Sequence, residues 1–165
     1  YEVIRYIDQS GRFAKLSPLK LEYFPLSPLI QEIAELSSAE MDKRGIRYSF
    51  SNEAEDDRVL GERSQIRQVL LNLGLNAMDA MPQGGTLSVR LYAEGGQIRI
   101  ELKDTGCGIP PNLLSTIHMP FISTKKNGLG LGLSKAYAII EEHGGSISCS
   151  STVGEGTVFT VCLNR

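Results

Sequence analysis

The chain has 165 residues, of which 41% are apolar, and a formal net charge of −2. This length suits one buried core, and the charge balance provides no overall basic field that would attract nucleic acid. No apolar run approaches the roughly 18 residues of a membrane-spanning helix, and no signal-peptide pattern is present. We therefore expect a cytoplasmic segment that contacts neither nucleic acid nor membrane, with three reduced cysteines that lack metal-ligand spacing.

The first 15 residues predict a helix that is too short to bury a core by itself, followed by a break at residues 16–18. We therefore divide the chain into residues 1–18, the end of a preceding element with its linker, and residues 19–165, one domain. A short strand is expected over 19–24. Ser27 followed by Pro28 predicts a helix start, with an apolar face that is formed by Leu29, Ile33, Leu36 and Met41 and an end near Gly45.

The rest of the chain alternates strand and helix patterns. The expected elements are strands over 46–51 and 59–60, a helix over 64–81, a hairpin of strands over 86–92 and 97–103, a short helix over 110–117, a helix over 131–143, and a hairpin of strands over 146–151 and 157–162. This order lacks the strict βαβ repetition of a doubly wound fold. It predicts a two-layer α/β sandwich, in which helices cover one face of a mixed or antiparallel sheet.

The run Gly128-Leu-Gly-Leu-Gly-Leu133 leads directly into the predicted helix over 131–143. Closely spaced glycines let backbone N–H groups approach phosphate oxygens, and a helix N-terminus adds a favourable dipole for anions. The run therefore indicates a phosphate-binding loop.

Asn72 and Asn76 lie four residues apart and so share one face of the helix over 64–81. Their amide oxygens suit a hard cation such as Mg²⁺, which needs few protein ligands when phosphates are present. Hydrogen bonding to a neighbouring loop explains the pair equally well. Asp79 is expected to be a surface charge.

Asp104 ends a predicted strand and is followed by Gly106 and Gly108, so its carboxylate could accept N–H bonds from a base that lies against bare backbone. Such a sequence is as often a simple turn, and Ile109 could be either a pocket wall or core. In the irregular stretch that follows, Lys125 could reach a γ-phosphate and Phe121 could latch a lid, although a solvated lysine is the commoner case.

Five blocks of the chain resemble, in order, the motifs of the catalytic ATP-binding domain of sensor histidine kinases. This domain belongs to a superfamily shared with type II DNA topoisomerases, MutL and a heat-shock chaperone. The blocks are residues 64–77 (N box), 104–108 (G1 box), 120–121 (F box), 128–132 (G2 box) and 154–157 (a last glycine motif). The similarity covers about residues 24–163 and is strongest to nitrogen-regulation and sporulation-type kinases.

The resemblance implies a Bergerat-type sandwich that binds ATP and Mg²⁺. It implies catalytic roles for Asn76, as the Mg²⁺ ligand, and for Lys125, which would hold phosphate. Asp104 would bind the adenine amine, with Thr157 in support. The implied ATP-binding set is Asn72, Asn76, Asp104, Gly106, Gly108, Ile109, Phe121, Lys125, Gly128, Gly130, Leu131, Gly132, Leu133 and Thr157.

One departure from the wider superfamily bears on mechanism. Members that hydrolyse ATP carry a glutamate base one turn before the metal asparagine, and here that position is Asn72. An amide cannot act as a base toward water, so we expect slow hydrolysis and transfer to a supplied acceptor.

The resemblance places that acceptor histidine on dimerisation helices of the same parent protein, with a response regulator downstream, and it allows a parent protein that is anchored in a membrane. Neither His118 nor His143 lies in the leader segment, so the acceptor is expected outside this chain, and the chain by itself is expected to be monomeric. Two alternatives stay open: a serine/threonine kinase that inactivates a sigma factor, and a non-enzymatic nucleotide-dependent signalling module.

Overall fold

The computed structural model describes residues 19–120 and 131–165. Its elements, in chain order, are β1 (Glu22–Pro25), α1 (Leu26–Arg44), β2 (Ile46–Asn52), β3 (Arg58–Gly61), α2 (Arg63–Ala80), β4 (Gly85–Glu94), β5 (Gln97–Asp104), α3 (Pro111–Leu114), α4 (Gly132–Glu142), β6 (Ser146–Thr152) and β7 (Gly156–Asn164). Within these residues no helix is long and apolar enough to span a bilayer. The helix predicted over residues 1–15 lies outside the described residues.

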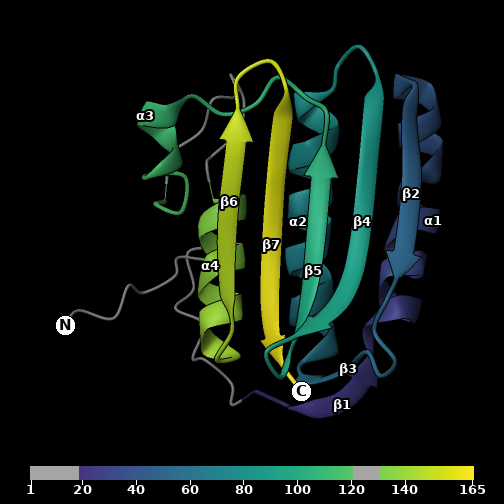
Figure 1. Cartoon of the computed structure of the whole chain (residues 1–165), viewed down its shortest axis with the longest axis vertical. Helices are drawn as coiled ribbons and strands as arrows, with labels where there is room; N and C mark the ends of the chain where they lie inside the picture. The colour runs from purple at the N-terminus through teal and green to yellow at the C-terminus, as the bar shows by residue number, and fades with distance from the viewer. Residues whose placement is uncertain (1–18, 121–130) are drawn as a thin grey trace, which may run out of the picture.

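Five strands form one mixed sheet in the order β2-β4-β5-β7-β6. The β2–β4 pair is parallel, and the other three pairs are antiparallel. Strands β1 and β3 pair in a separate two-stranded sheet. Figure 1 shows α1, α2 and α4 on one side of the large sheet, and no helix or strand of residues 19–120 and 131–165 covers its other side. The two-layer α/β sandwich predicted from the element order is confirmed.

The core lies between the sheet and these three helices. Along β5 every second residue is buried, and the buried series Ile98, Ile100 and Leu102 continues to Asp104 at the end of the strand. Helix α2 buries Ile66, Val69, Leu70, Leu73 and Ala77, as its periodicity predicts. The strand alternation therefore turns the carboxyl group of Asp104 toward the helix layer.

The start of α1 differs from the prediction. The N-cap residue is Pro25, and Ser27 lies inside the first turn, where its hydroxyl donates a hydrogen bond to the carboxylate of Asp57. Leu36, predicted on the apolar face, is 62% exposed. The helical period placed Leu36 at the edge of the apolar face, and the sheet covers only the residues nearer its centre.

His143, predicted only to suit a helix dipole, joins two helices. Its Nε2 accepts the backbone N–H of Glu62, the N-cap residue of α2, at 3.0 Å. Its Nδ1 lies 2.7 Å from the carbonyl oxygen of Ile139, which implies the tautomer with the proton on Nδ1. The ring thus connects the end of α4 to the start of α2.

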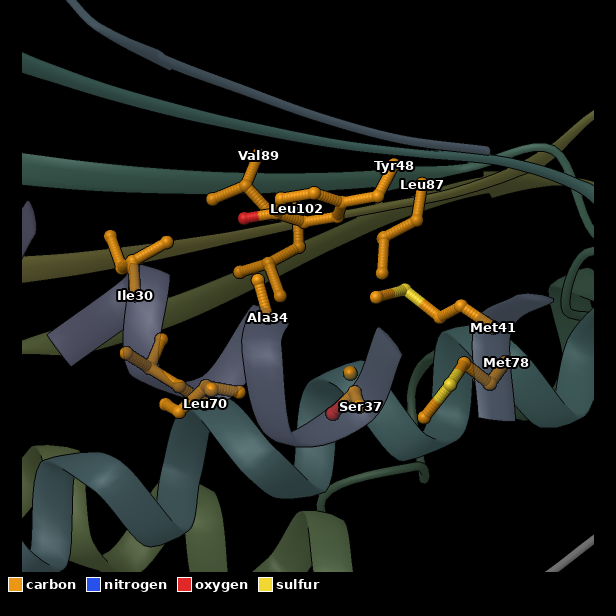
Figure 2. Close-up of a pocket in the computed structure, with 12 residues that line it drawn as sticks. Ile30, Ala34, Ser37, Met41, Tyr48, Leu70, Met78, Leu87, Val89 and Leu102 are labelled. Atoms are coloured by element: carbon orange, nitrogen blue, oxygen red, sulfur yellow. The ribbon is translucent and has the colours of Figure 1, made fainter. Parts of the chain in front are cut away.

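An apolar cavity of about 40 Å³ lies between α1, α2 and strands β2, β4 and β5. Figure 2 shows Ile30, Met41, Met78, Leu87 and Leu102 around it. Three further lining residues, Ala34, Ser37 and Gly74, are small and leave the space unfilled. The helix layer is therefore underpacked against this part of the sheet.

Candidate nucleotide site

The carboxylate of Asp104 is 4% exposed at the end of β5. Its Oδ1 accepts the N–H of Gly106 at 2.8 Å. Burial raises the pKa of Asp104, while the backbone N–H groups of Gly106 and Thr157 act in the opposite direction. A buried carboxylate is costly to ionise, and a pKa that burial raises is typical of a functional position.

The loop after Asp104 approaches its neighbours so closely that it excludes side chains at two positions. A Cβ atom at Gly106 would lie 2.6 Å from the carbonyl oxygen of Ala80, and one at Gly108 would lie 2.2 Å from the carbonyl oxygen of Thr152. Gly108 also has a φ of 73°, in the left-handed region. Because these glycines lack side chains, the loop can pack tightly between the end of α2 and the β6–β7 turn.

Backbone hydrogen bonds fix the loop in this position. The N–H of Cys107 donates to the carbonyl oxygen of Ala80 at 3.0 Å, and the carbonyl oxygen of Cys107 accepts the N–H of Gly154 at 2.9 Å. Ile109, for which the sequence left two interpretations, is half-buried and packs against the main core cluster.

Ser151 is a further candidate residue that the sequence analysis missed. It pairs directly with Thr157 across the β6–β7 hairpin, and its hydroxyl contacts Thr157, Gly156 and the backbone of Ile109. Thr157, which is 4% exposed, in turn pairs with Asp104 across β5 and β7. Aligning the predicted hairpin around Gly154 would have placed Ser151 opposite Thr157.

The paired amides on α2 lie at the other end of the site. The amide nitrogen of Asn72 donates to the carbonyl oxygen of Gly132 at 3.2 Å, so α2 is joined to the first residue of α4. Asn76 is half-buried one turn later. Asp79 is exposed, as predicted, and its carboxylate pairs with Arg44 at 3.0 Å. The amide nitrogen of Asn72 thus bonds to the backbone of a neighbouring helix.

Some of the predicted phosphate-binding residues lie within the described part of the chain and others do not. Leu131 is the N-cap residue of α4, and its carbonyl oxygen accepts the hydroxyl of Ser134. Leu133 is half-buried and packs against the core. The remaining predicted site residues, Phe121, Lys125, Gly128 and Gly130, lie outside the described residues.

Burial shapes the titration of the groups around Asp104. Burial, with a smaller contribution from the charge of Asp104, raises the pKa of the Cys149 thiol on β6 to about 12. Burial raises the pKa of Tyr137 on α4 to about 12 as well. The Cys149 thiol and the Tyr137 hydroxyl are therefore both partly withdrawn from water.

Among residues 19–120 and 131–165, no three His, Cys, Asp or Glu side chains gather in a way that could hold a metal ion. A cation at this site would depend on amide and phosphate oxygens. Mg²⁺ tolerates this donor set because it keeps several waters and binds through few protein ligands beside substrate phosphates. The paired amides of α2 fit that chemistry.

The geometry thus brings together a buried carboxylate, a glycine loop that packs against the end of α2, and two amides on α2, of which Asn72 is hydrogen-bonded to the start of α4. A family model described as "Histidine kinase-, DNA gyrase B-, and HSP90-like ATPase" matches residues 61–165, which include all of these features. The chain belongs to this family. Within it, the chain is homologous to the catalytic domains of sensor histidine kinases, as its relatives indicate.

Sporulation kinase A of Bacillus subtilis (strain 168) is 36% identical over 144 residues, which cover 87% of this chain and 24% of that protein. The sensor histidine kinase ZraS of Escherichia coli (strain K12) is 34% identical over 159 residues, which cover 96% and 34%. The chain thus spans between a quarter and about a third of the length of these relatives.

Solved structures of histidine kinases are also similar to this chain. The nucleotide-free catalytic domain of histidine kinase ThkA has a TM-score of 0.81 at 34% identity, over 88% of this chain and 96% of that one. Full-length ShkA in complex with AMPPNP has a TM-score of 0.82 at 26% identity, over 91% and 32%. ThkA in complex with the response regulator TrrA has a TM-score of 0.77 at 32% identity, over 88% and 42%.

Proposed function

We propose that this domain binds ATP with Mg²⁺ and transfers the γ-phosphoryl group to a histidine on dimerisation helices of the same parent protein, as part of a two-component system. The observation that carries the nucleotide assignment is the buried carboxylate of Asp104 within a glycine loop. The AMPPNP complex of the similar kinase ShkA supports this assignment.

At the base end, the carboxylate of Asp104 would accept an N–H bond from the exocyclic amine of adenine. Its Oδ1 accepts the N–H of Gly106, and an ionised carboxylate has about four lone-pair sites, so acceptor positions remain for a ligand. The bare backbone at Gly106 and Gly108 would let the flat ring lie close, Ile109 would supply an apolar wall, and Thr157 would support the contact.

At the phosphate end, Asn76 would coordinate Mg²⁺ with Asn72 beside it. When bound, Mg²⁺ supplies positive charge that offsets the charge developing on the phosphates. The family resemblance assigns phosphate contacts to Lys125 and to the glycine run, and a latch to Phe121. The run and its neighbours that take part are Gly128, Gly130, Leu131, Gly132 and Leu133.

Slow ATP hydrolysis is part of the proposal. Asn72 occupies the position of the glutamate base in the hydrolysing members, and its amide nitrogen donates to Gly132. An amide in that role cannot take a proton from water. Transfer therefore depends on an imidazole acceptor that brings its own nucleophilic nitrogen, with positioning supplying most of the rate.

For the parent protein we propose only the division of this chain into segments, its location and the class of its downstream partner. We assign residues 1–18 to the end of the phosphoacceptor helix and its linker, and residues 19–165 to the catalytic domain, which would be cytoplasmic and monomeric when isolated. The solved complex of ThkA with a response regulator supports a regulator as the downstream partner. Acid-labile phosphate on a reconstituted acceptor module would support the histidine kinase, whereas acid-stable phosphate would favour the serine/threonine alternative.

The first test is calorimetric titration of the chain with ADP, with and without Mg²⁺. We expect Mg²⁺-dependent binding that Asp104→Asn weakens more than tenfold, which corresponds to about 1.4 kcal/mol. The same variant should spare or improve the binding of inosine diphosphate, because the new amide can donate to a 6-oxo group that the carboxylate repels.

Asp79→Asn is the matched control, since it makes the same chemical change at an exposed carboxylate on α2, away from the end of β5. It should leave the affinities for both nucleotides unchanged. Unchanged ADP affinity in Asp104→Asn would remove the adenine assignment.

A further inference from the structure

The hydroxyl of Ser151 contacts three groups at once. It lies 2.8 Å from the backbone nitrogen of Ile109, 2.8 Å from the carbonyl oxygen of Gly156 and 2.9 Å from the hydroxyl oxygen of Thr157. A serine hydroxyl has one proton to donate and two lone pairs that accept. All three contacts can be satisfied at once, but only with one arrangement of protons.

The partners dictate that arrangement. A backbone N–H can only donate, so Ile109 donates to Ser151. A carbonyl oxygen can only accept, and two oxygens 2.8 Å apart repel unless a proton lies between them, so Ser151 donates to Gly156. The proton of Ser151 is then used, and the contact with Thr157 requires Thr157 to donate.

This direction of the hydrogen bond from Thr157 to Ser151 affects the end of the site that is proposed to bind the base. Thr157 lies directly opposite Asp104 in the β5–β7 register, and its backbone N–H stabilises the charged form of that carboxylate. With its hydroxyl proton directed at Ser151, Thr157 can offer only acceptor lone pairs to a ligand. The carboxylate beside it also only accepts.

We propose that Ser151 is a specificity-determining positioning residue that keeps this end of the site acceptor-only and so favours a 6-amino purine over a 6-oxo purine. The inference rests on the proposed function, because it takes the site to be the one that binds the purine. Ser151 acts through Thr157 and does not itself contact the base.

A purely structural role for Ser151 makes a different prediction. Ser151 also anchors Ile109, so its loss loosens the glycine loop for every purine nucleotide alike. Such loosening lowers the affinities for ADP and inosine diphosphate by the same factor. Release of the Thr157 proton changes their ratio, because a freed hydroxyl can rotate and donate to a 6-oxo group.

The test is the ratio of the dissociation constants for inosine diphosphate and ADP, measured by calorimetry. In Ser151→Ala we expect the ratio to fall by about tenfold, as for one lost hydrogen-bond preference. Ser151→Thr keeps the hydroxyl and should restore the ratio. Ser150→Ala is the matched control, because Ser150 is the exposed neighbour whose side chain points to the other face of the sheet.

The outcomes separate the two proposals. No ADP binding by the unsubstituted chain would overturn the proposed function and this inference together. Normal ADP binding with an unchanged ratio in Ser151→Ala would overturn this inference alone. If Ser151→Ala does not fold, NMR of the unsubstituted chain decides: a slowly exchanging Thr157 hydroxyl proton close to Ser151 supports the inference, and one directed at Asp104 overturns it.

Discussion

Gly74 lies in the interior of α2 and lines the apolar cavity under α1. A Cβ atom at this position would meet no heavy atom within 4 Å, and Gly74 is not among the glycines with positive φ. Alanine is favoured over glycine in a helix interior by about 0.8–1 kcal/mol. We therefore expect Gly74→Ala to stabilise the domain by about 1 kcal/mol and to raise its Tm by about 2–4 °C.

Urea and thermal unfolding followed by circular dichroism measure this change, with an unchanged m-value as the sign that only stability has moved. Gly106→Ala is the contrasting variant, since its Cβ would lie 2.6 Å from both the Cβ and the carbonyl oxygen of Ala80. It should destabilise the domain by about 1–3 kcal/mol. A Tm for Gly74→Ala equal to or below that of the unsubstituted chain would refute the reasoning, because it would mean that the space at Gly74 is required.

Two further predictions concern titrating groups. Because burial raises the pKa of Asp104, the folded state binds its proton more tightly than the unfolded state does, and ionisation costs stability above that pKa. Without nucleotide, Asp104→Asn should raise the Tm at pH 7, and the difference should shrink as the pH falls through the raised pKa toward the usual value of 3.8; a gap that is independent of pH would contradict this. At pH 8 an aromatic disulfide reagent should modify only one thiol rapidly in the native chain, the exposed Cys107, because the pKa of Cys149 is raised to about 12 and Cys162 is buried. Cys107→Ser should abolish the fast phase, and a remaining fast thiol would show that β6 opens.

The element pattern was largely predictable from sequence because it depends on local periodicity. Helix α2 and both hairpins were expected within a few residues of where they lie, since each carries a clear apolar repeat and a glycine turn. The start of α1 was wrong by two residues. Serine before proline is a local signal for a helix start, and it was overridden by a tertiary hydrogen bond from Ser27 to Asp57, thirty residues away.

The candidate site divides in the same way. Asp104, its two glycines and the paired asparagines were proposed as candidates from spacing, because each belongs to a short motif. Ser151 was missed, because its role depends on the register of a hairpin and on contacts with Ile109 and Thr157. The exposure of Leu36 was missed for a related reason, since helical period shows which residues share a face and not how far the sheet covers it.

By itself the sequence determined the types of elements and the two-layer class of the fold, and it supplied the candidate site residues, because these follow from periodicity and from short motifs. Only the tertiary structure decided that β2 runs parallel to β4, that β1 and β3 form a sheet of their own, and that Asp104, Thr157 and Ser151 lie side by side on three neighbouring strands. The physical reason is that strand pairing, and the direction of the hydrogen bonds among side chains on neighbouring strands, arise from contacts between segments far apart in the chain. Local propensity carries no information about such contacts until packing of the core has selected one register.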